Sequence, residues 1–344
     1  MLSSLKKISQ TLLAKQQSGF IIVILLLAVI LTALAGSHVD RTTGKTVNNF
    51  FNPHTLMQTA TDASFFAIMA VGATMVIISN GIDLSVGSIY ALCGVVTASM
   101  LRYLHIDSPS AVALGIFVSL GLGLVCGMLN GLMVVGLEVH PFIITLGTMW
   151  IFRGIAFVMS KAESILVPSA LTAFVKANLG LSPALYPAAM LIMIAVTAAG
   201  AFYLSKTVMG RHIYAIGGNA EASRYAGLHV KRITVSVFAI SGLTAGIAAF
   251  MGSAYYGSAS CGDATGYELY VIASAVVGGA SLSGGKGNAV SAMLGAILIV
   301  LIRQSIRTLH FDQNYEWIII GAATIIAVVL DKLNTRLTLK RAMK

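Results

Sequence analysis

Charged side chains are scarce in this 344-residue chain. Asp, Glu, Lys and Arg make up 10% of it, against about a quarter of an ordinary soluble domain, while apolar residues make up 57%. A soluble globule cannot bury so large an apolar fraction, and a disordered chain carries far more charge. About 196 apolar residues provide for about ten membrane-spanning helices of roughly 20 residues each. The composition therefore predicts an all-α, polytopic integral membrane protein.

Cysteine is rare as well. The three cysteines, Cys93, Cys126 and Cys261, are an odd number without paired spacing, so we expect neither a disulfide framework nor a metal site. The histidines form no HExxH pair, and no nucleophile stands beside an evident base. The sequence thus predicts a chain that is not an enzyme and that holds no metal or cofactor.

A nucleotide-binding loop is also missing. Residues Ser283–Gly287 read SGGKG, but a phosphate-binding P-loop needs Gly six residues before its Lys and Ser or Thr directly after it. Those two positions hold Ala280 and Gly287. The segment is better explained as a flexible turn between two spans.

Long apolar runs bounded by charged or turn residues place the expected spans. They fall near residues 19–35, 63–79, 86–101, 111–135, 142–160, 184–204, 233–255, 267–280, 289–302 and 316–330. Several are short and contain Gly and Ser, which predicts broken or tilted helices that pack through small residues. Residues 1–344 are expected to form one transmembrane domain.

The basic residues predict the orientation of this domain, because Lys and Arg in short loops are retained on the cytoplasmic side. If the N-terminus is inside, fourteen of the 22 Lys and Arg residues lie in cytoplasmic segments, seven lie outside, and Arg153 lies within a span. We therefore expect both termini in the cytoplasm. The net charge of +10 is then an orientation signal, and no nucleic-acid partner is expected.

The N-terminal segment has two interpretations. A basic stretch followed by an apolar run and Ala33-Leu34-Ala35 resembles a cleavable secretory signal. The apolar run extends from Gly19 to Ala35, longer than a usual signal core, which favours an uncleaved first span.

The segment 205–232 is the longest expected cytoplasmic loop. Gly217 and Gly218 can form a tight turn, Asn219 is a suitable N-cap, and Glu221 in the next turn favours the helix dipole. These residues predict a short helix at Ala220–Tyr225, ended by Gly227. Such a helix can be docked by a soluble partner or can lie on anionic lipid, and composition alone leaves both open.

Four segments carry a family resemblance. They read GRHIYAIGGNAEASRYAGLHV at Gly210–Val230, SNGIDLSVGS at Ser79–Ser88, PFIITLGTMWIFRGIAF at Pro141–Phe157 and GYELYVIASAVVGGASLSGGKG at Gly266–Gly287. In this order they resemble the permease subunits of bacterial ABC importers for monosaccharides, the ribose, galactose and xylose group. The segment from about 36 to 52 is less familiar in that family.

The resemblance implies a division of labour in a multi-pass protein of the bacterial inner membrane. Two permeases, as a homodimer or a related heterodimer, would form the pathway, ATP-binding subunits would dock on the cytoplasmic face and hydrolyse ATP, and a periplasmic binding protein would deliver the sugar. The resemblance does not fix which pentose, hexose or other small polar solute is carried. It places the docking residues in loop 205–232 at Gly217, Gly218, Asn219, Glu221, Ala222 and Arg224.

Candidate pathway residues lie first in the segment between the second and third spans. A carboxylate such as Asp83 is expensive among apolar residues unless it is paired or caps a helix. We expect Asp83 or Ser85 to cap the third span. The alternative is that this loop contacts a partner or lines the pathway with Asn80, Asp83 and Ser85.

Arg153 is the only basic residue deep inside an expected span, about 16 Å from its start. We expect it to pair with a carboxylate such as Glu268 and to fix helix packing, with direct sugar contact by either residue as the alternative. The aromatic residues near expected outer helix ends, among them Tyr270 and Trp317, fit an interfacial belt. Trp150, in mid-span, is the exception that can line the pathway.

Two other classes compete with an ATP-driven importer. An ion-coupled secondary transporter would place ionisable groups near the membrane midplane. All twelve acidic residues, from Asp40 to Asp331, fall in expected loops or at span ends, with Asp83 moving inward only if its loop re-enters the membrane. A membrane enzyme would need a catalytic cluster that the sequence does not display.

Overall fold

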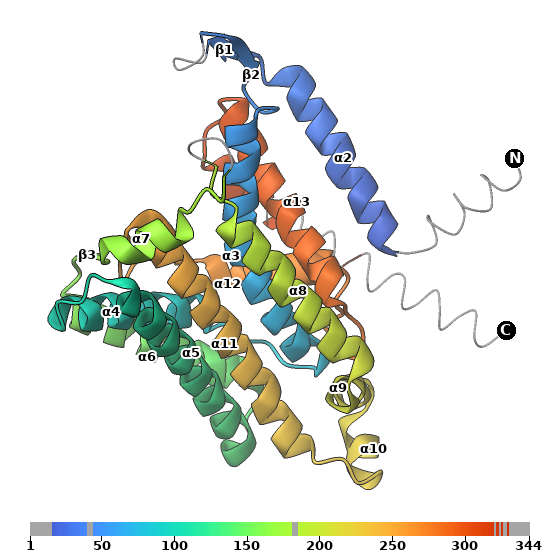
Figure 1. Ribbon diagram of the computed structural model, residues 1–344. Coiled ribbons are helices and arrows are strands. Elements are labelled where there is room, and N and C mark those ends of the chain that lie inside the picture. Colours follow the sequence, from blue (N-terminus) through green and yellow to red (C-terminus); the bar gives the residue numbers. More distant parts are fainter. Residues whose placement is uncertain are drawn as a thin grey trace, which may run out of the picture.

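The computed structural model describes residues 16–39, 44–180, 185–319, 321, 322, 325 and 329. Helices dominate these residues, with two short antiparallel β-pairs (Figure 1). In chain order the elements are α2 (Gln16–Leu34), β1 (Ser37–Val39), β2 (Thr46–Asn48), α3 (Pro53–Ile78), α4 (Val86–Tyr103), α5 (Pro109–Leu137), α6 (Pro141–Ser160), β3 (Ile165–Leu166), α7 (Ser169–Val175), α8 (Ala188–Lys206), α9 (Val208–Gly218), α10 (Ala220–Tyr225), α11 (Val230–Tyr256), β4 (Ser258–Ala259), α12 (Tyr267–Val277) and α13 (Ala289–Thr308).

Local sequence signals explain where several helices begin. Asn52 caps α3 by accepting a hydrogen bond from the backbone N–H of Thr55, and Asn288 caps α13 in the same way through Val290. Proline stands at the start of α3, α5 and α6, where its missing N–H costs nothing. These are the cap and proline signals of ordinary helices.

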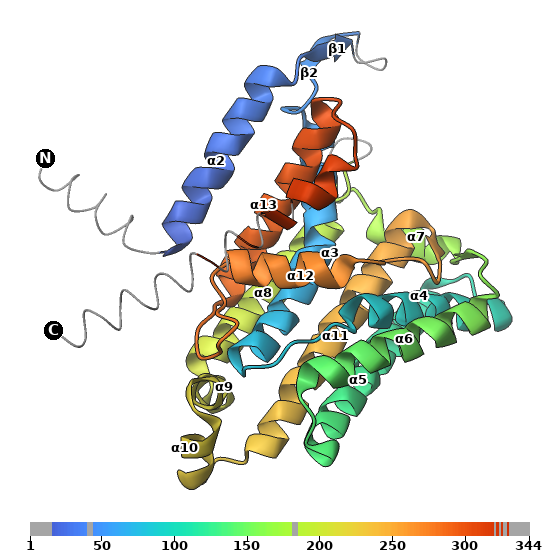
Figure 2. The same cartoon turned by 180° about the vertical axis from the view of Figure 1, so that it is seen from behind.

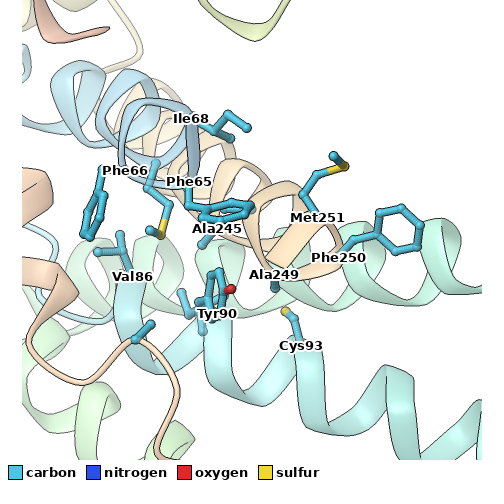
Figure 3. Packing of buried hydrophobic residues seen from close by; sticks show 14 of the residues in the cluster. Phe65, Phe66, Ile68, Val86, Tyr90, Cys93, Ala245, Ala249, Phe250 and Met251 are labelled. Atoms are coloured by element: carbon cyan, nitrogen blue, oxygen red, sulfur yellow. The ribbon is translucent and has the colours of Figure 1, made fainter. Parts of the chain in front are cut away.

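Helix α3 forms the centre of the molecule. It packs against α8, α11, α12 and α13, and all its residues from Ala63 to Ile78 are buried. Phe65, Phe66 and Ile68 of α3 pack with Tyr90 of α4 and Met251 of α11 in one apolar cluster (Figure 3). Helix α12 runs across the long helices (Figure 2).

Helices α5 and α11 approach each other closely through glycine. A Cβ atom on Gly127 would collide with the carbonyl oxygen of Phe238, and one on Gly242 would collide with the backbone of α5. Small residues that permit such backbone approach are typical of helix packing in membranes. The expectation of packing through small residues is confirmed here.

Seven helices in the described part of the chain are long and apolar enough to cross a membrane: α3, α4, α5, α6, α8, α11 and α13. Two shorter apolar helices, Gly19–Leu34 within α2 and Tyr267–Val277, match the expected spans 19–35 and 267–280. The expected span 316–330 lies partly outside the described residues. An all-helical membrane protein is thus found, while the count of ten spans stays a prediction.

The second expected span differs from the helix that forms there. Helix α3 begins at Pro53, ten residues before the expected start at residue 63, because Asn52 and Pro53 supply a helix start ahead of the apolar run. Asp62, expected at a span end, therefore lies inside a helix.

The ends of the molecule are distinct. The hairpin β1–β2, paired with His38 opposite Val47, lies at one end, and α9 and α10 lie at the other (Figures 1 and 2). Asn49 and Asn52 fix the connection from the hairpin to α3, since Asn49 donates to the carbonyl of Ala35 and Asn52 donates to that of Asn48.

Candidate functional site

The expected short helix in loop 205–232 is confirmed. Helix α10 spans Ala220–Tyr225, and the Asn219 side chain caps it by accepting a hydrogen bond of 2.8 Å from the backbone N–H of Ala222. Gly227 follows with φ +84°, the left-handed conformation that ends helices at glycine. Glu221 lies in the first turn, where a carboxylate interacts favourably with the helix dipole.

The expected tight turn at Gly217 and Gly218 is wrong. Both glycines belong to the last turn of α9, which ends at Asn219, whose backbone is extended. Thr207 starts α9 by accepting from the backbone N–H of Gly210 at 3.0 Å. This cap stabilises the start of α9, a helix that the sequence pattern does not predict because the two glycines indicate a turn.

Gly217 lies at a crossing of three segments. A Cβ atom there would overlap the carbonyl oxygen of Ile78 at the end of α3, and it would lie 2.5 Å from the backbone nitrogen of Gly285. Gly285 donates its N–H to that same carbonyl at 2.8 Å, and Tyr214 of α9 donates its hydroxyl to the carbonyl of Gly287 at 2.7 Å. Helix α9 is therefore fastened to the end of α3 and to the glycine-rich turn before α13.

The six residues expected to dock a partner divide into two groups. Gly217 is buried in the crossing just described. The other five are exposed on α9 and α10: Gly218, Asn219, Glu221, Ala222 and Arg224. A substitution at Gly217 therefore acts inside the chain, whereas one at Gly218 acts on the surface.

Asp83 forms a buried polar network that joins three helices. Its side chain is 2% exposed. Oδ1 accepts from the backbone N–H of Ser85 at 2.9 Å and from the Ser85 hydroxyl at 2.6 Å, and Oδ2 accepts from the Ser241 hydroxyl of α11 at 2.8 Å. The side chain of Asn130 on α5 donates to the Ser85 hydroxyl at 2.7 Å.

This network corrects the capping interpretation. Ser85 occupies the N-cap position of α4, but its side chain makes no capping hydrogen bond; the hydroxyl donates to Asp83 instead. Ser241 lies eleven residues into α11, about 16 Å along its axis, so the segment containing Asp83 enters the helix bundle. The buried carboxylate is partnered within the protein, as the energetic cost of an isolated one requires.

Arg153 binds backbone carbonyls. Its Nη1 donates to the carbonyl of Cys261 at 2.7 Å and to that of Asp263 at 2.6 Å. The expected partner Glu268 forms no close ion pair with Arg153 among the described residues, although the opposite charges of the two side chains attract each other. The role in packing is supported in another form, since Arg153 fastens the segment between α11 and α12 to α6. In that segment burial raises the pKa of the Asp263 carboxyl.

Replacement of Arg153 tests this fastening. Arg153→Gln removes two charge-assisted hydrogen bonds, each worth roughly 1.5–3 kcal/mol. We expect the free energy of unfolding to fall by about 2–4 kcal/mol, measured by thermal unfolding of the purified protein. Arg102→Gln, at an exposed position at the end of α4, serves as the control and should leave stability within about 0.5 kcal/mol. If Arg153→Gln is as stable as the wild type but does not transport, direct contact with the solute replaces the packing role.

The other candidate pathway residues are scattered. Asn80 is exposed with φ +67°, and Trp150 on α6 is 68% exposed. Glu268 is half-buried on α12, beside Gly87 at the start of α4. The structure therefore brings Asp83 and Ser85 together but does not gather all six candidates into one site.

A second polar cluster, missed in the sequence, lies on α13. Arg303 Nε lies 2.6 Å from Glu316 Oε1, and Arg307 Nη1 lies 3.5 Å from Asp62 Oδ2 of α3. Two arginines four residues apart occupy the same helix face; that spacing is the signal that could have indicated the cluster. Tyr270 beside it is only 3% exposed, so the interfacial-belt interpretation is wrong for this residue.

Asp107 fastens one of the connections outside the spans. Its carboxylate accepts from the backbone N–H of Ala170 and from the Ser169 hydroxyl, both at 2.9 Å. These hydrogen bonds lower the pKa of Asp107 below its usual value of 3.8. The contact thus joins the turn after α4 to the start of α7, and it weakens only when the pH falls through the lowered pKa.

Comparison with known proteins decides the family. The model of the family described as the branched-chain amino acid transport system / permease component matches residues 55–328. The chain belongs to this permease family. It is a multi-pass permease of the inner membrane.

Named relatives of this permease are sugar importers. The ribose import permease protein of Escherichia coli strain K12 is 37% identical over 287 residues, which cover 83% of this chain and 86% of the relative. The D-allose transport system permease protein of the same strain is 35% identical, covering 83% and 85%. The L-arabinose ABC transporter permease protein of Azospirillum brasilense is 31% identical, covering 87% and 85%. No solved structure matches the permease.

Proposed function

We propose that this permease is the membrane-spanning subunit of an ATP-driven importer that moves a monosaccharide into the cell. The observation that carries the proposal is the identity of 31–37% to permeases named for ribose, D-allose and L-arabinose, over more than four-fifths of the chain. The family description names branched-chain amino acids, so such an amino acid is the alternative cargo.

The proposal includes the arrangement of the importer. Ten spans place both termini in the cytoplasm, on the same side as α9 and α10. Two permease copies, identical or related, enclose the pathway, and a periplasmic binding protein delivers the sugar at the end that bears the β1–β2 hairpin. A separate ATP-binding subunit docks on α10 and hydrolyses ATP, since the permease itself has no catalytic role in this scheme.

The surface of segment 205–232 supports docking there. Glu221, Ala222 and Arg224 are exposed on a helix that is too short to span a membrane. Helix α9, which leads into it, is fastened to α3 and to the turn before α13 through Gly217 and Gly285. Movement of a partner against α10 can therefore be passed to the transmembrane helices, and ATP binding would shift the population between outward-open and inward-open states.

Uptake in cells tests the proposed function. The permease is expressed together with its ATP-binding subunit and binding protein, and uptake of labelled ribose, allose, fructose, arabinose and leucine is measured. We expect uptake of at least one sugar, which stops on ATP depletion and persists when the ion gradient is collapsed. Uptake of leucine alone would contradict the assignment of a monosaccharide as the cargo. Uptake that depends on the ion gradient would contradict the ATP-driven mechanism.

The docking surface has a test of its own. Gly218 has open space around it, so Gly218→Trp should leave folding intact while obstructing a partner that sits on α10. We expect at least a tenfold loss (about 1.4 kcal/mol) in the affinity of the ATP-binding subunit, measured by co-purification and titration. Gly136→Trp, at an equally open site on α5, is the matched control. Equal binding by both variants would place docking elsewhere.

A further inference from the structure

The ion pairs of Arg303 and Arg307 on α13 are largely shielded from solvent. The side chains of Arg303, Glu316 and Asp62 are 18%, 13% and 17% exposed, and that of Arg307 is 41% exposed. Stability alone does not account for such pairs, because replacing a buried ion pair by apolar groups is often neutral or stabilising. Ionisable residues within membrane segments are rare, and they commonly mark substrate pathways.

Both pairs retain capacity to bind something else. Arg303 Nε and the Tyr270 hydroxyl converge on the same oxygen of Glu316, Oε1, each at 2.6 Å, and no described residue donates to its other oxygen. The Arg307–Asp62 pair is long at 3.5 Å, and the hydroxyl of Tyr256 donates to Asp62 at 3.3 Å. The contacts of Asp62 are long enough for a hydroxyl-bearing solute to replace them, and the second oxygen of Glu316 can accept a hydrogen bond from such a solute.

Aromatic rings surround the charged groups. The Arg303 guanidinium lies 5.4 Å from the ring centre of Phe66 and 5.1 Å from that of Tyr270. Tyr267 packs on Phe66 at 4.5 Å, and Trp317 lies 5.9 Å from Tyr270. Trp317 is 58% exposed, so it leaves ring surface available for a ligand.

Arg307 also lines an open cavity of about 440 Å³, a volume within the range typical of ligand sites. Every residue around it carries a hydrogen-bonding side chain: His38, Asn49, Gln304, Arg307, Thr308 and His310. The cavity lies between α13 and the β1–β2 hairpin. It therefore joins the α13 cluster to the end of the molecule where a solute would enter under the proposed function.

We propose that the α13 cluster, consisting of Asp62, Tyr270, Arg303, Arg307, Glu316 and Trp317, is a low-affinity contact site for a monosaccharide on the pathway. Carboxylates accept and guanidinium groups donate hydrogen bonds to the hydroxyls, while the apolar C–H face of the sugar ring packs on Trp317. A sugar ring can use both features at once, because its hydroxyls meet the charged groups while its C–H face meets Trp317. The charged ends of a free amino acid can pair with the same groups, so leucine is the comparison solute in the test. Weak binding suits a pathway that has to release its cargo.

Binding at the site can be followed by tryptophan fluorescence, because the chain has few tryptophans. The chain contains two, Trp150 and Trp317, so Trp150→Phe leaves Trp317 as the sole indole reporter. The full-length variant in lipid nanodiscs is titrated with ribose, allose, fructose and arabinose in the millimolar range, with glycerol and leucine as control solutes. We expect a saturable change in Trp317 emission with at least one sugar, and only a linear change with the controls.

Two further substitutions test whether the change in Trp317 emission comes from the α13 cluster. In the same background, Glu316→Gln should raise the half-saturating sugar concentration about tenfold, a loss of about 1.4 kcal/mol in binding free energy. Arg102→Gln should leave this concentration unchanged. A linear response to every sugar, or a saturable response that Glu316→Gln does not alter, overturns the site. Because this inference rests on the proposed function, uptake is measured in parallel: sugar uptake without a saturable response refutes the site alone, whereas uptake of leucine without sugar refutes the function.

Discussion

Gly217→Ala is expected to reduce transport at least tenfold, although it adds a single methyl group. The new Cβ would overlap the Ile78 carbonyl oxygen and crowd the Gly285 nitrogen, which are backbone atoms joined to each other by a hydrogen bond. Overpacking of this kind costs roughly 1–3 kcal/mol, more than the gain of up to about 1 kcal/mol that alanine brings to a helix. Steric strain therefore exceeds the gain in helix propensity.

A glycine away from the proposed docking surface supplies the matched control. Gly136→Ala makes the same chemical change in α5, where a Cβ atom meets nothing within 4 Å. It should keep the thermal stability and the uptake of the wild type. Uptake per molecule of membrane-inserted protein and thermal unfolding are measured for both variants. Wild-type uptake by Gly217→Ala would show that the crossing of α9, α3 and the turn before α13 does not transmit movement.

Asp83→Ala is expected to destabilise the permease strongly. The substitution leaves the Ser85 N–H and the Ser85 and Ser241 hydroxyls without their acceptor, in a site where Ser85 and Ser241 are fully buried. An unsatisfied buried donor costs roughly 1–3 kcal/mol. Relief of the buried carboxylate offsets part of this, so we expect a loss of about 2–4 kcal/mol, measured by thermal unfolding of the purified protein.

Asp83→Asn distinguishes hydrogen bonding from charge. Asparagine retains one side-chain acceptor, which can serve Ser85, and the hydroxyl of Ser241 can rotate to accept from the amide. We therefore expect Asp83→Asn to recover more than half of the stability that Asp83→Ala loses. A stable but inactive Asp83→Ala would instead assign Asp83 to the pathway, and a stable, active one would show that neither role is needed.

The sequence allowed the helices to be located but not their contacts. Helix α10 was predictable to the residue because its signals, Asn219 and Gly227, act within one or two turns. The partners of Arg153 were not, because it binds carbonyl groups, and any residue supplies a carbonyl. Only the path of the chain from α11 to α12 decides that Cys261 and Asp263 present theirs.

The same limit applies to the glycines and to the α13 cluster. The pair Gly217-Gly218 suggests a turn, yet the first glycine serves a backbone contact with Ile78, which is far away in sequence. Asp62 and Arg307 are 245 residues apart in the sequence. Their pairing depends on α3 and α13 lying side by side, which local patterns cannot indicate.

The glycine contacts between α5 and α11 allow these two helices to move together as one rigid unit. At the glycine positions backbone lies against backbone, so few flexible side chain atoms lie between the two helices to absorb a displacement. Four residues separate the end of α10 from the start of α11, which is 27 residues long, about 40 Å at 1.5 Å per residue. A tilt of only about 5° at the α10 end would then move the far end, near Tyr256, by roughly 3.5 Å. A small movement at the α10 end can thus become a displacement near Tyr256 that is comparable with the size of a hydroxyl group.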